Sequence, residues 1–210
     1  MRGSEIVVAG DAVPPLLAAA RLVQEDLCLL RRGADGYVLV AAALCFPSSW
    51  SLADKIGRPM IAIHEHVPGY RERLAARIDR IFDSLRVELP VWRVNWSIYP
   101  DADLHHPEPK QRPRNWFAET GDLISRAFVR VERQTLRRLP ASGDILFTIK
   151  VLVDPLEGLR RHPNGAQLAR GLRDQIAALD RDQLAYKSML EHRDGMVRAL
   201  DALCAARERE

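Results

Sequence analysis

Hydrophobic and polar residues alternate with a period of two in two segments of this chain. In residues 91–99, VWRVNWSIY, the apolar positions Trp92, Val94, Trp96 and Ile98 alternate with Arg93, Asn95, Ser97 and Tyr99. In residues 128–136, FVRVERQTL, the positions Val129, Val131 and Arg133 alternate with Arg130, Glu132 and Gln134. Successive side chains of a β-strand point to opposite faces, so both segments are predicted to be strands. Their polar members are expected to share one face of a sheet.

Two further strands are predicted from apolar runs. Residues 144–153, DILFTIKVLV, follow the turn-like PASGD, which predicts an antiparallel hairpin with the strand before it. Residues 36–46, GYVLVAAALCF, are interpreted as a buried strand. Their alanines leave a short helix open, because an unbroken apolar run does not reveal its period.

Helices are predicted around these strands. The clearest covers residues 68–85, where Tyr70, Leu74, Ile78, Ile81, Phe82 and Leu85 recur at helical spacing with charges between them. Strong helix formers after a proline pair predict a helix over residues 14–31, ending near Gly33. Serine caps and a following glycine predict a short helix within residues 47–57. Two C-terminal helices are expected over residues 163–180 and 182–206.

Together these elements predict a mixed α+β fold with a largely antiparallel sheet and flanking helices. The chain of 210 residues is 47% hydrophobic and 28% charged, which is typical of one globular domain, here residues 1–210. Residues 100–116, PDADLHHPEPKQRPRNW, are rich in proline and too long for a simple turn. They are predicted to form a flexible lid or rim.

The charge pattern and the absence of targeting signals in the sequence indicate which partners and which cellular location to expect. The formal net charge is +3, and basic residues are interleaved with acidic ones, so nucleic acid is not expected as a partner. No apolar run reaches the roughly 20 residues that span a bilayer, and the first residues lack the apolar centre of a secretory signal. We therefore expect a cytoplasmic protein without a membrane partner. Cys28, Cys45 and Cys204 form no C-x-x-C pair, and reduced, buried thiols are expected.

Two groups of residues are candidates for chemistry. His64 and His66, in IAIHEHVPGY, would share a face if this segment were extended, which suits a metal, although a structural or surface role stays open. Arg93, Asn95 and the polar positions of residues 128–136 could line a polar pocket, or form the solvated face of an antiparallel sheet. No H-E-x-x-H, nucleophile-elbow, phosphate-loop or dinucleotide-binding motif occurs.

Several stretches together resemble one family. They are LVQEDLCLL, LCFPSSWSLADKIGRPMIAIHEHVPGY, RVNWSIYP, VERQTLRRLPASGDILFTI and LAYKSML. In this order, over roughly residues 20–190, they are similar to the haem-dependent oxidative N-demethylase family. The resemblance implies a PAS-like fold around a non-covalent haem b and O2-dependent removal of a methyl group from a small secondary amine. Electrons would come from NADPH through flavin and iron–sulfur partner proteins.

The resemblance also implies roles for individual residues. His64 matches the histidine of the family's IH-x-x-VP pattern and is the expected axial ligand of the haem iron, whereas His66 is secondary. Glu132 and Arg133 become the catalytic candidates, and Arg93, Asn95 and Gln134 the candidates for cofactor binding. Glu132 could hold a protonated amine or relay a proton, and Arg93 or Arg133 could pair with a haem propionate. Alternation places Arg133 opposite Glu132, so both reach one pocket only across a bulge or strand twist.

Three hypotheses follow from the resemblance. An oxidase would carry a closed, mostly apolar pocket beside His64. A haem-binding sensor or carrier would have the same fold without a productive substrate site. In a protein without haem, HEHVP would be structural. Family members usually carry a longer segment before LVQEDLCLL, so a shortened member is a further expectation.

Overall fold

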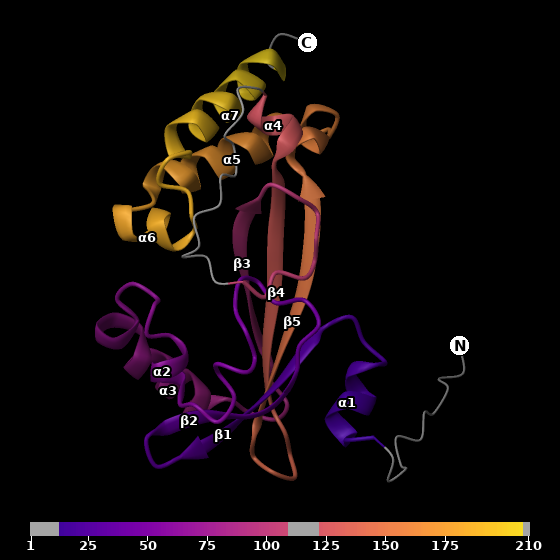
Figure 1. The fold of residues 1–210 in the computed structure, drawn as a ribbon, viewed down its shortest axis with the longest axis vertical. Coiled ribbons are helices and arrows are strands. Elements are labelled where there is room, and N and C mark those ends of the chain that lie inside the picture. The colour runs from indigo at the N-terminus through magenta and orange to yellow at the C-terminus, as the bar shows by residue number, and fades with distance from the viewer. Residues whose placement is uncertain (1–12, 109–121, 208–210) are drawn as a thin grey trace.

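The computed structural model describes residues 13–108 and 122–207. Five strands form one sheet in the order β2-β1-β5-β4-β3, and every neighbouring pair is antiparallel (Figure 1). The strands are β1 (Asp26–Gly33), β2 (Gly36–Ala43), β3 (Val91–Tyr99), β4 (Phe128–Arg138) and β5 (Ile145–Pro155). The α+β fold and the hairpin of β4 with β5 are confirmed, and β3 has the predicted bounds. The PAS-like description of this fold stays a prediction.

The helices gather at two ends of the sheet (Figure 1). Near β1 and β2 lie α1 (Pro15–Ala20), α2 (Met60–Ile63), the π-helical turn η1 (Tyr70–Leu74) and α3 (Ala75–Ser84). At the other end lie α4 (Leu123–Arg126), the 3-10 turn η2 (Leu156–Arg160), α5 (Gly165–Ala178), α6 (Arg181–Tyr186) and α7 (Arg193–Arg207). The amphipathic helix expected over residues 68–85 is confirmed, with a π-helical first turn. None of the helices in the described ranges is long and apolar enough to cross a membrane.

The predicted helix over residues 14–31 is wrong beyond Ala20. Residues 26–33 form β1, which pairs with β2 on one side and β5 on the other. Leu27, Cys28 and Leu30 are buried there. Helix propensity is worth only tenths of a kcal/mol per residue, and burial in the middle of a sheet outweighs it.

Two shorter predictions are also corrected. Residues 47–57 form turns instead of a helix, and Ser49 has a left-handed φ of 65°. The helix expected over residues 182–206 is interrupted, because Ser188 adopts a φ of 57° after α6. The amides of Ser188 and Met189 then donate to the carbonyls of Ala185 and Leu184, which is the Schellman helix stop.

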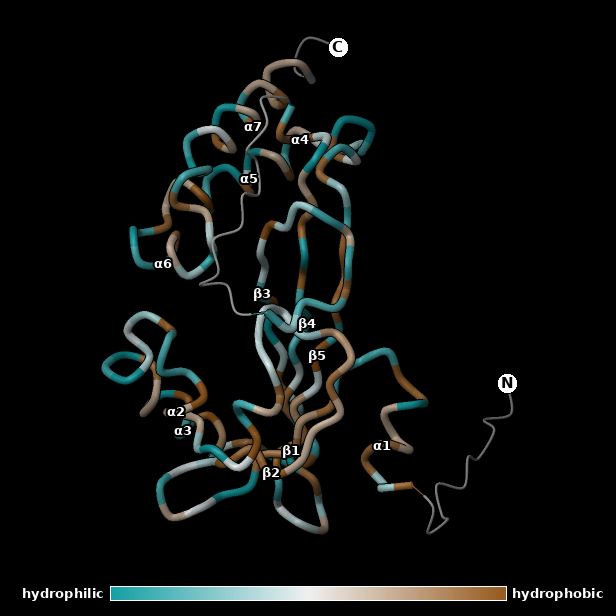
Figure 2. The backbone as a smooth tube through the Cα atoms, viewed as in Figure 1, coloured by the Kyte–Doolittle hydropathy of each residue, from teal (hydrophilic) through white to brown (hydrophobic). Residues whose placement is uncertain are grey.

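Two clusters of buried hydrophobic residues form the core. The helical cluster consists of Ile98, Ile124, Ala127, Leu156, Ala169, Ile176, Leu184, Met189, Met196, Leu200, Leu203 and Cys204. The hairpin cluster consists of Cys28, Leu30, Tyr37, Leu39, Phe82, Leu85 and Ile145. Figure 2 shows the hydrophobic segments of β1 and β2 that contribute to the hairpin cluster. Cys28 and Cys204 are buried as expected, and burial raises the pKa of Cys28 to about 12, whereas Cys45 is exposed.

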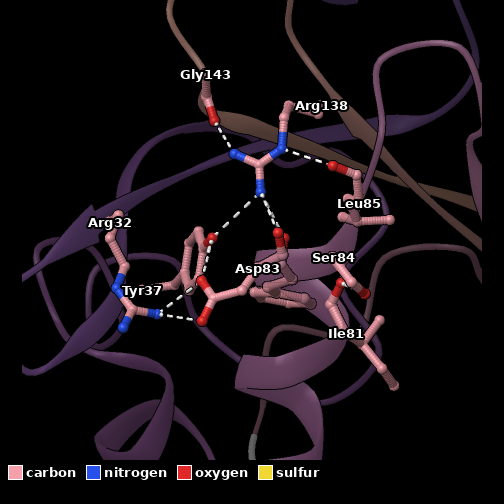
Figure 3. Close-up of polar contacts among 9 residues, drawn as sticks. Arg32, Tyr37, Ile81, Asp83, Ser84, Leu85, Arg138 and Gly143 are labelled. Atoms are coloured by element: carbon pink, nitrogen blue, oxygen red, sulfur yellow. Dashed lines mark hydrogen bonds and ion pairs between the residues drawn. The ribbon is translucent and has the colours of Figure 1, made fainter.

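A polar network fastens α3 to the β1–β2 hairpin (Figure 3). The hydroxyl of Tyr37 and the guanidinium of Arg32 both donate to the carboxylate of Asp83. Arg138 of β4 donates to the carbonyls of Phe82 and Leu85, which lie at the C-terminal end of α3. Because the last carbonyls of a helix have no partner within it, these bonds fix the end of α3 to the sheet.

Arg130 of β4 holds two irregular segments over the polar face of the sheet. Its side chain is only 1% exposed. Its guanidinium donates to the hydroxyl of Ser48 and to the carbonyls of Phe46, Pro47, Asp103 and Leu104, at 2.8–3.3 Å. Asp26 of β1, also buried, accepts from the amides of Cys45 and Phe46. The segments around residues 45–48 and 103–104 are therefore tied to buried charges.

We expect Arg130→Met to lower the free energy of unfolding by about 2–4 kcal/mol, because the hydroxyl of Ser48 and four buried or partly buried carbonyls lose their donor. Urea denaturation measures the loss. Arg133→Met is the matched control on the same strand. Arg133 is exposed on the opposite face and has one 3.7 Å ion pair, with Glu25, so its loss is expected to cost under about 1 kcal/mol. Equal losses in the two variants would contradict the role of Arg130.

Candidate functional site

A proline–glycine turn folds the histidine motif back on itself. His64 directly follows α2, and Tyr70 opens η1. Gly69 lies between them with a φ of 66°, and an added Cβ would lie 3.0 Å from Nε of Arg73. Both facts favour glycine at this position. The turn brings the Tyr70 ring against the His64 ring, with centroids 4.5 Å apart and planes 8° from parallel.

The two imidazole nitrogens of His64 have different surroundings. Nδ1 lies 2.9 Å from the carbonyl oxygen of Met60, one turn earlier in the chain. A carbonyl only accepts, so Nδ1 carries the proton and donates to it. Nε2 is then the nitrogen with the free lone pair. This is the arrangement in which a histidine commonly binds a metal, because the backbone bond fixes both tautomer and ring orientation.

Electrostatics keep this imidazole neutral. Burial lowers the pKa of His64, the hydrogen bond to Met60 opposes that change, and the nearby charges of Lys55 and Arg93 lower the pKa further. Burial also raises the pKa of Tyr70 to about 12, so its hydroxyl stays protonated at neutral pH. The stacked pair therefore presents an uncharged surface with one available nitrogen.

A cavity of about 390 Å³ adjoins His64. Its lining comes from one stretch of chain: Ile61, His64, Glu65, His66, Val67, Pro68, Gly69, Tyr70, Arg71 and Glu72. His66 is largely exposed and lies 3.4 Å from the carboxylate of Glu65. The cavity is partly open and carries charged residues, so it differs from the closed, mostly apolar pocket that was expected.

A second group of candidates forms a hydrogen-bonded chain on β3 and β4. Nε of Arg93 donates to Oε1 of Gln134 at 2.8 Å, and Nε2 of Gln134 donates to Oε2 of Glu132 at 2.8 Å. Nδ2 of Asn95 also donates to this Oε2, at 3.3 Å. The strand register places Arg93 beside Gln134 and Asn95 beside Glu132. Glu132 and Gln134 are 7% and 9% exposed, so this part of the sheet is not a solvated face.

Arg93 connects the two groups electrostatically. Its charge contributes to the lowered pKa of His64, while its Nε belongs to the chain that ends at Glu132. Lys187, which directly follows α6, donates to the carbonyl of Trp96 and lies over the indole ring of that residue. Burial lowers the pKa of Lys187, and the charge of Glu132 opposes this change.

The structure does not bring Arg133 to this chain. β4 pairs with β3 and β5 in a continuous register, so no bulge turns Arg133 toward Glu132. Its guanidinium instead lies 3.7 Å from Glu25. His105 and His106 also lie elsewhere, near the carbonyl of Cys45 and the carboxylate of Asp101. Of the predicted lid, residues 109–116 lie outside the described residues.

Sequence reasoning missed two residues of the site. Tyr70 was interpreted as an apolar position of a helix, which it is, but its ring also covers His64. Lys187 lies in the LAYKSML stretch, where the residues alone indicated no role. Its place at the end of α6 depends on the left-handed φ of Ser188, which the sequence does not reveal. Both contacts are made between segments that no local pattern relates.

The chain is similar to a known protein family. A family model described as haem-dependent oxidative N-demethylase, alpha subunit-like, matches residues 2–197. The donor set fits a haem better than a metal ion held by protein alone. Within the described ranges, no three His, Cys, Asp or Glu residues are grouped so that they could hold a metal. His64 offers a single oriented nitrogen, which is what axial ligation requires.

The lowered pKa of His64 predicts a pH dependence of stability in the chain without added cofactor. Above the unfolded pKa of about 6.5, both states are neutral at this residue. As the pH falls below that value, the unfolded state takes up a proton more readily than the folded state, so the free energy of unfolding decreases. His64→Gln should remove this part of the slope in urea denaturation between about pH 7.5 and 5. His66→Gln, largely exposed, is the control; a wild-type slope in His64→Gln would contradict the prediction.

Proposed function

The chain belongs to the haem-dependent oxidative N-demethylase, alpha subunit-like family, and from this premise we propose that it oxidises an N-methyl group of a small secondary amine. The family description carries the haem dependence and the oxidative chemistry. The substrate class, a dimethylamine-like compound, is our proposal. So are the b-type haem, the PAS-like character of the fold and the electron supply from NADPH through flavin and iron–sulfur partners.

The orientation of His64 is the observation that supports the proposal most directly. The Met60 carbonyl holds the proton on Nδ1, so Nε2 is the atom that would bind the haem iron. The neutral form that ligation needs is favoured by burial and by two neighbouring cations. Tyr70 keeps the ring from rotating, because the two rings are stacked. His66 is largely exposed, and no backbone carbonyl of the described residues accepts a hydrogen bond from its ring.

Glu132 is suited to hold the amine. Both of its side-chain hydrogen bonds end on Oε2, and among the described residues no donor is bound to Oε1. A protonated secondary amine has two N–H donors and a positive charge, so Oε1 would accept from it in a charge-assisted bond. Asn95 and Gln134 fix the carboxylate, which orients Oε1. Arg133 has no place in this arrangement.

Arg93 is the residue proposed to meet a haem propionate. Its Nε is bound to Gln134, which orients the guanidinium, and residue 93 is exposed. Among the described residues, none forms a hydrogen bond with the two terminal nitrogens, which could therefore meet an anion. An arginine–carboxylate contact of this kind is directional and strong. One side chain would thus connect the cofactor with the residues that hold the amine.

Bound haem would supply the iron centre for O2 reduction, which no amino-acid side chain provides. The overall balance consumes a dimethylamine-like substrate, one O2, two electrons and two protons. It yields the monomethylamine, formaldehyde and water. The protein side chains contribute binding and orientation: His64 at the iron, Glu132 at the amine nitrogen and Arg93 at a propionate.

We expect the haem-supplemented protein to show a Soret band that is lost or displaced in His64→Ala and retained in His66→Ala. Ferric and dithionite-reduced absorption spectra of all three proteins measure this. The haem-loaded wild-type protein, supplied with dimethylamine, O2 and a reductant that delivers two electrons per turnover, such as ascorbate with a redox mediator, is expected to release formaldehyde. Glu132→Gln should retain the Soret band and release at least about tenfold less, because the charge-assisted bond is lost.

The outcomes separate the hypotheses. Haem that is bound through His64 without amine-dependent formaldehyde would indicate a sensor or carrier. Absence of stoichiometric haem in the wild-type protein would contradict both haem hypotheses and leave HEHVP a structural feature.

A further inference from the structure

Lys55 lies in a turn that is fixed to the sheet. Residues 52–58 form this turn beside β2. The amide of Gly57 donates to the carbonyl of Leu39 at 2.8 Å, and the amide of Leu39 donates to the carbonyl of Arg58 at 3.2 Å. Leu39 itself is buried in the hairpin cluster. The position from which Lys55 extends is therefore set by the core of the domain.

From this turn, Lys55 reaches the helix that carries His64. Its ammonium group donates to the carbonyl oxygen of Ile63 at 2.6 Å. Ile63 is the last residue of α2 and the immediate neighbour of His64. A cation at the C-terminal end of a helix satisfies a carbonyl that has no partner within the helix and complements its partial negative charge.

The helix depends on such outside contacts because it is short. α2 has four residues, far fewer than an isolated helix needs to be stable in water. Its apolar side chains Met60 and Ile63 pack against the hairpin cluster. The carbonyl of Met60 accepts from both the amide and Nδ1 of His64, and the carbonyl of Ile63 accepts from Lys55.

We propose that Lys55 is a positioning residue for His64: its bond to Ile63 holds the end of α2 against the β2-anchored turn and thereby sets the direction of His64 Nε2, the atom that would bind the haem iron. This inference rests on the proposed function. Lys55 does not touch the cofactor or the substrate in this role. The nearby Arg58 donates to the carbonyl of Asp54 within its own turn, and in the described part of the chain no hydrogen bond joins its side chain to α2.

The first test measures haem release. Ferric haem is transferred from the loaded protein to excess apomyoglobin, and the rate is followed at the Soret band. Lys55→Met is expected to release haem about 10–100-fold faster, as is usual when a group that orients a metal ligand is removed. Lys55→Arg, which retains a cationic donor, should release haem at a rate close to that of the wild type. Arg58→Met is the control and should match the wild type; equal rates in Lys55→Met and wild type would overturn the inference.

The second test asks whether Lys55 acts through His64. In His64→Gly supplied with free imidazole, the ligand is no longer attached to α2. Lys55→Met should then leave the rate of haem release within about twofold of His64→Gly alone, since independent changes add and coupled ones do not. If Lys55→Met instead speeds haem release as much in His64→Gly as in the wild-type background, Lys55 supports the fold in general, which would contradict the inference.

A third measurement needs no haem and separates this inference from the proposed function. The amides of Ile63 and His64 donate to the carbonyls of Pro59 and Met60. Lys55→Met should speed their hydrogen exchange in the haem-free chain by at least about tenfold, while Arg58→Met should not. Unchanged exchange would overturn the positioning role. Absence of haem binding with faster exchange would contradict only the proposed function.

Discussion

The buried guanidinium of Arg130 is the constraint that organises the polar face of the sheet, on which Glu132 and Gln134 also lie. A charge removed from water must be hydrogen-bonded, and the acceptors here are Ser48 and carbonyls of two segments without regular structure. Those segments follow β2 and β3, and their hydrogen bonds to Arg130 hold them over the sheet. Asp26 adds a second buried charge on the same face of the sheet. The polar face is therefore covered because it is charged.

The two clusters of the hydrophobic core lie on opposite faces of the sheet. Val129 of β4 and its partner Ile98 adjoin the helical cluster on the face opposite Glu132 and Gln134. Leu136 adjoins the hairpin cluster on the same face as Glu132 and Gln134. This polar strip beside an apolar cluster loses packing area, but it provides fixed hydrogen-bonding groups in a region with little water, where charge-assisted bonds are stronger. The strip therefore combines burial with side chains whose directions are fixed by hydrogen bonds.

The sequence predicted the parts of this structure that local pattern determines. Alternation located β3 and the polar face of β4, and helical spacing located α3, because these patterns follow directly from backbone geometry. The expected helix over residues 14–31 was wrong because pairing on both sides of β1 has no local signature. His64 was identified by family resemblance. The three-dimensional structure was needed to show that His64 contacts Tyr70 and Met60. It was also needed to show that Lys55 bonds to the end of α2.

Lys187 has a consequence for behaviour in concentrated solution. It bonds to the carbonyl of Trp96 on β3, which is an outer strand of the sheet. An outer strand with open carbonyls and apolar side chains is a template for strand addition from another molecule, and Trp92 and Val94 are both well exposed there. A lysine fixed over that strand, with its ring contact to Trp96, obstructs such addition. The helix stop at Ser188 places Lys187 at this point of the sheet edge.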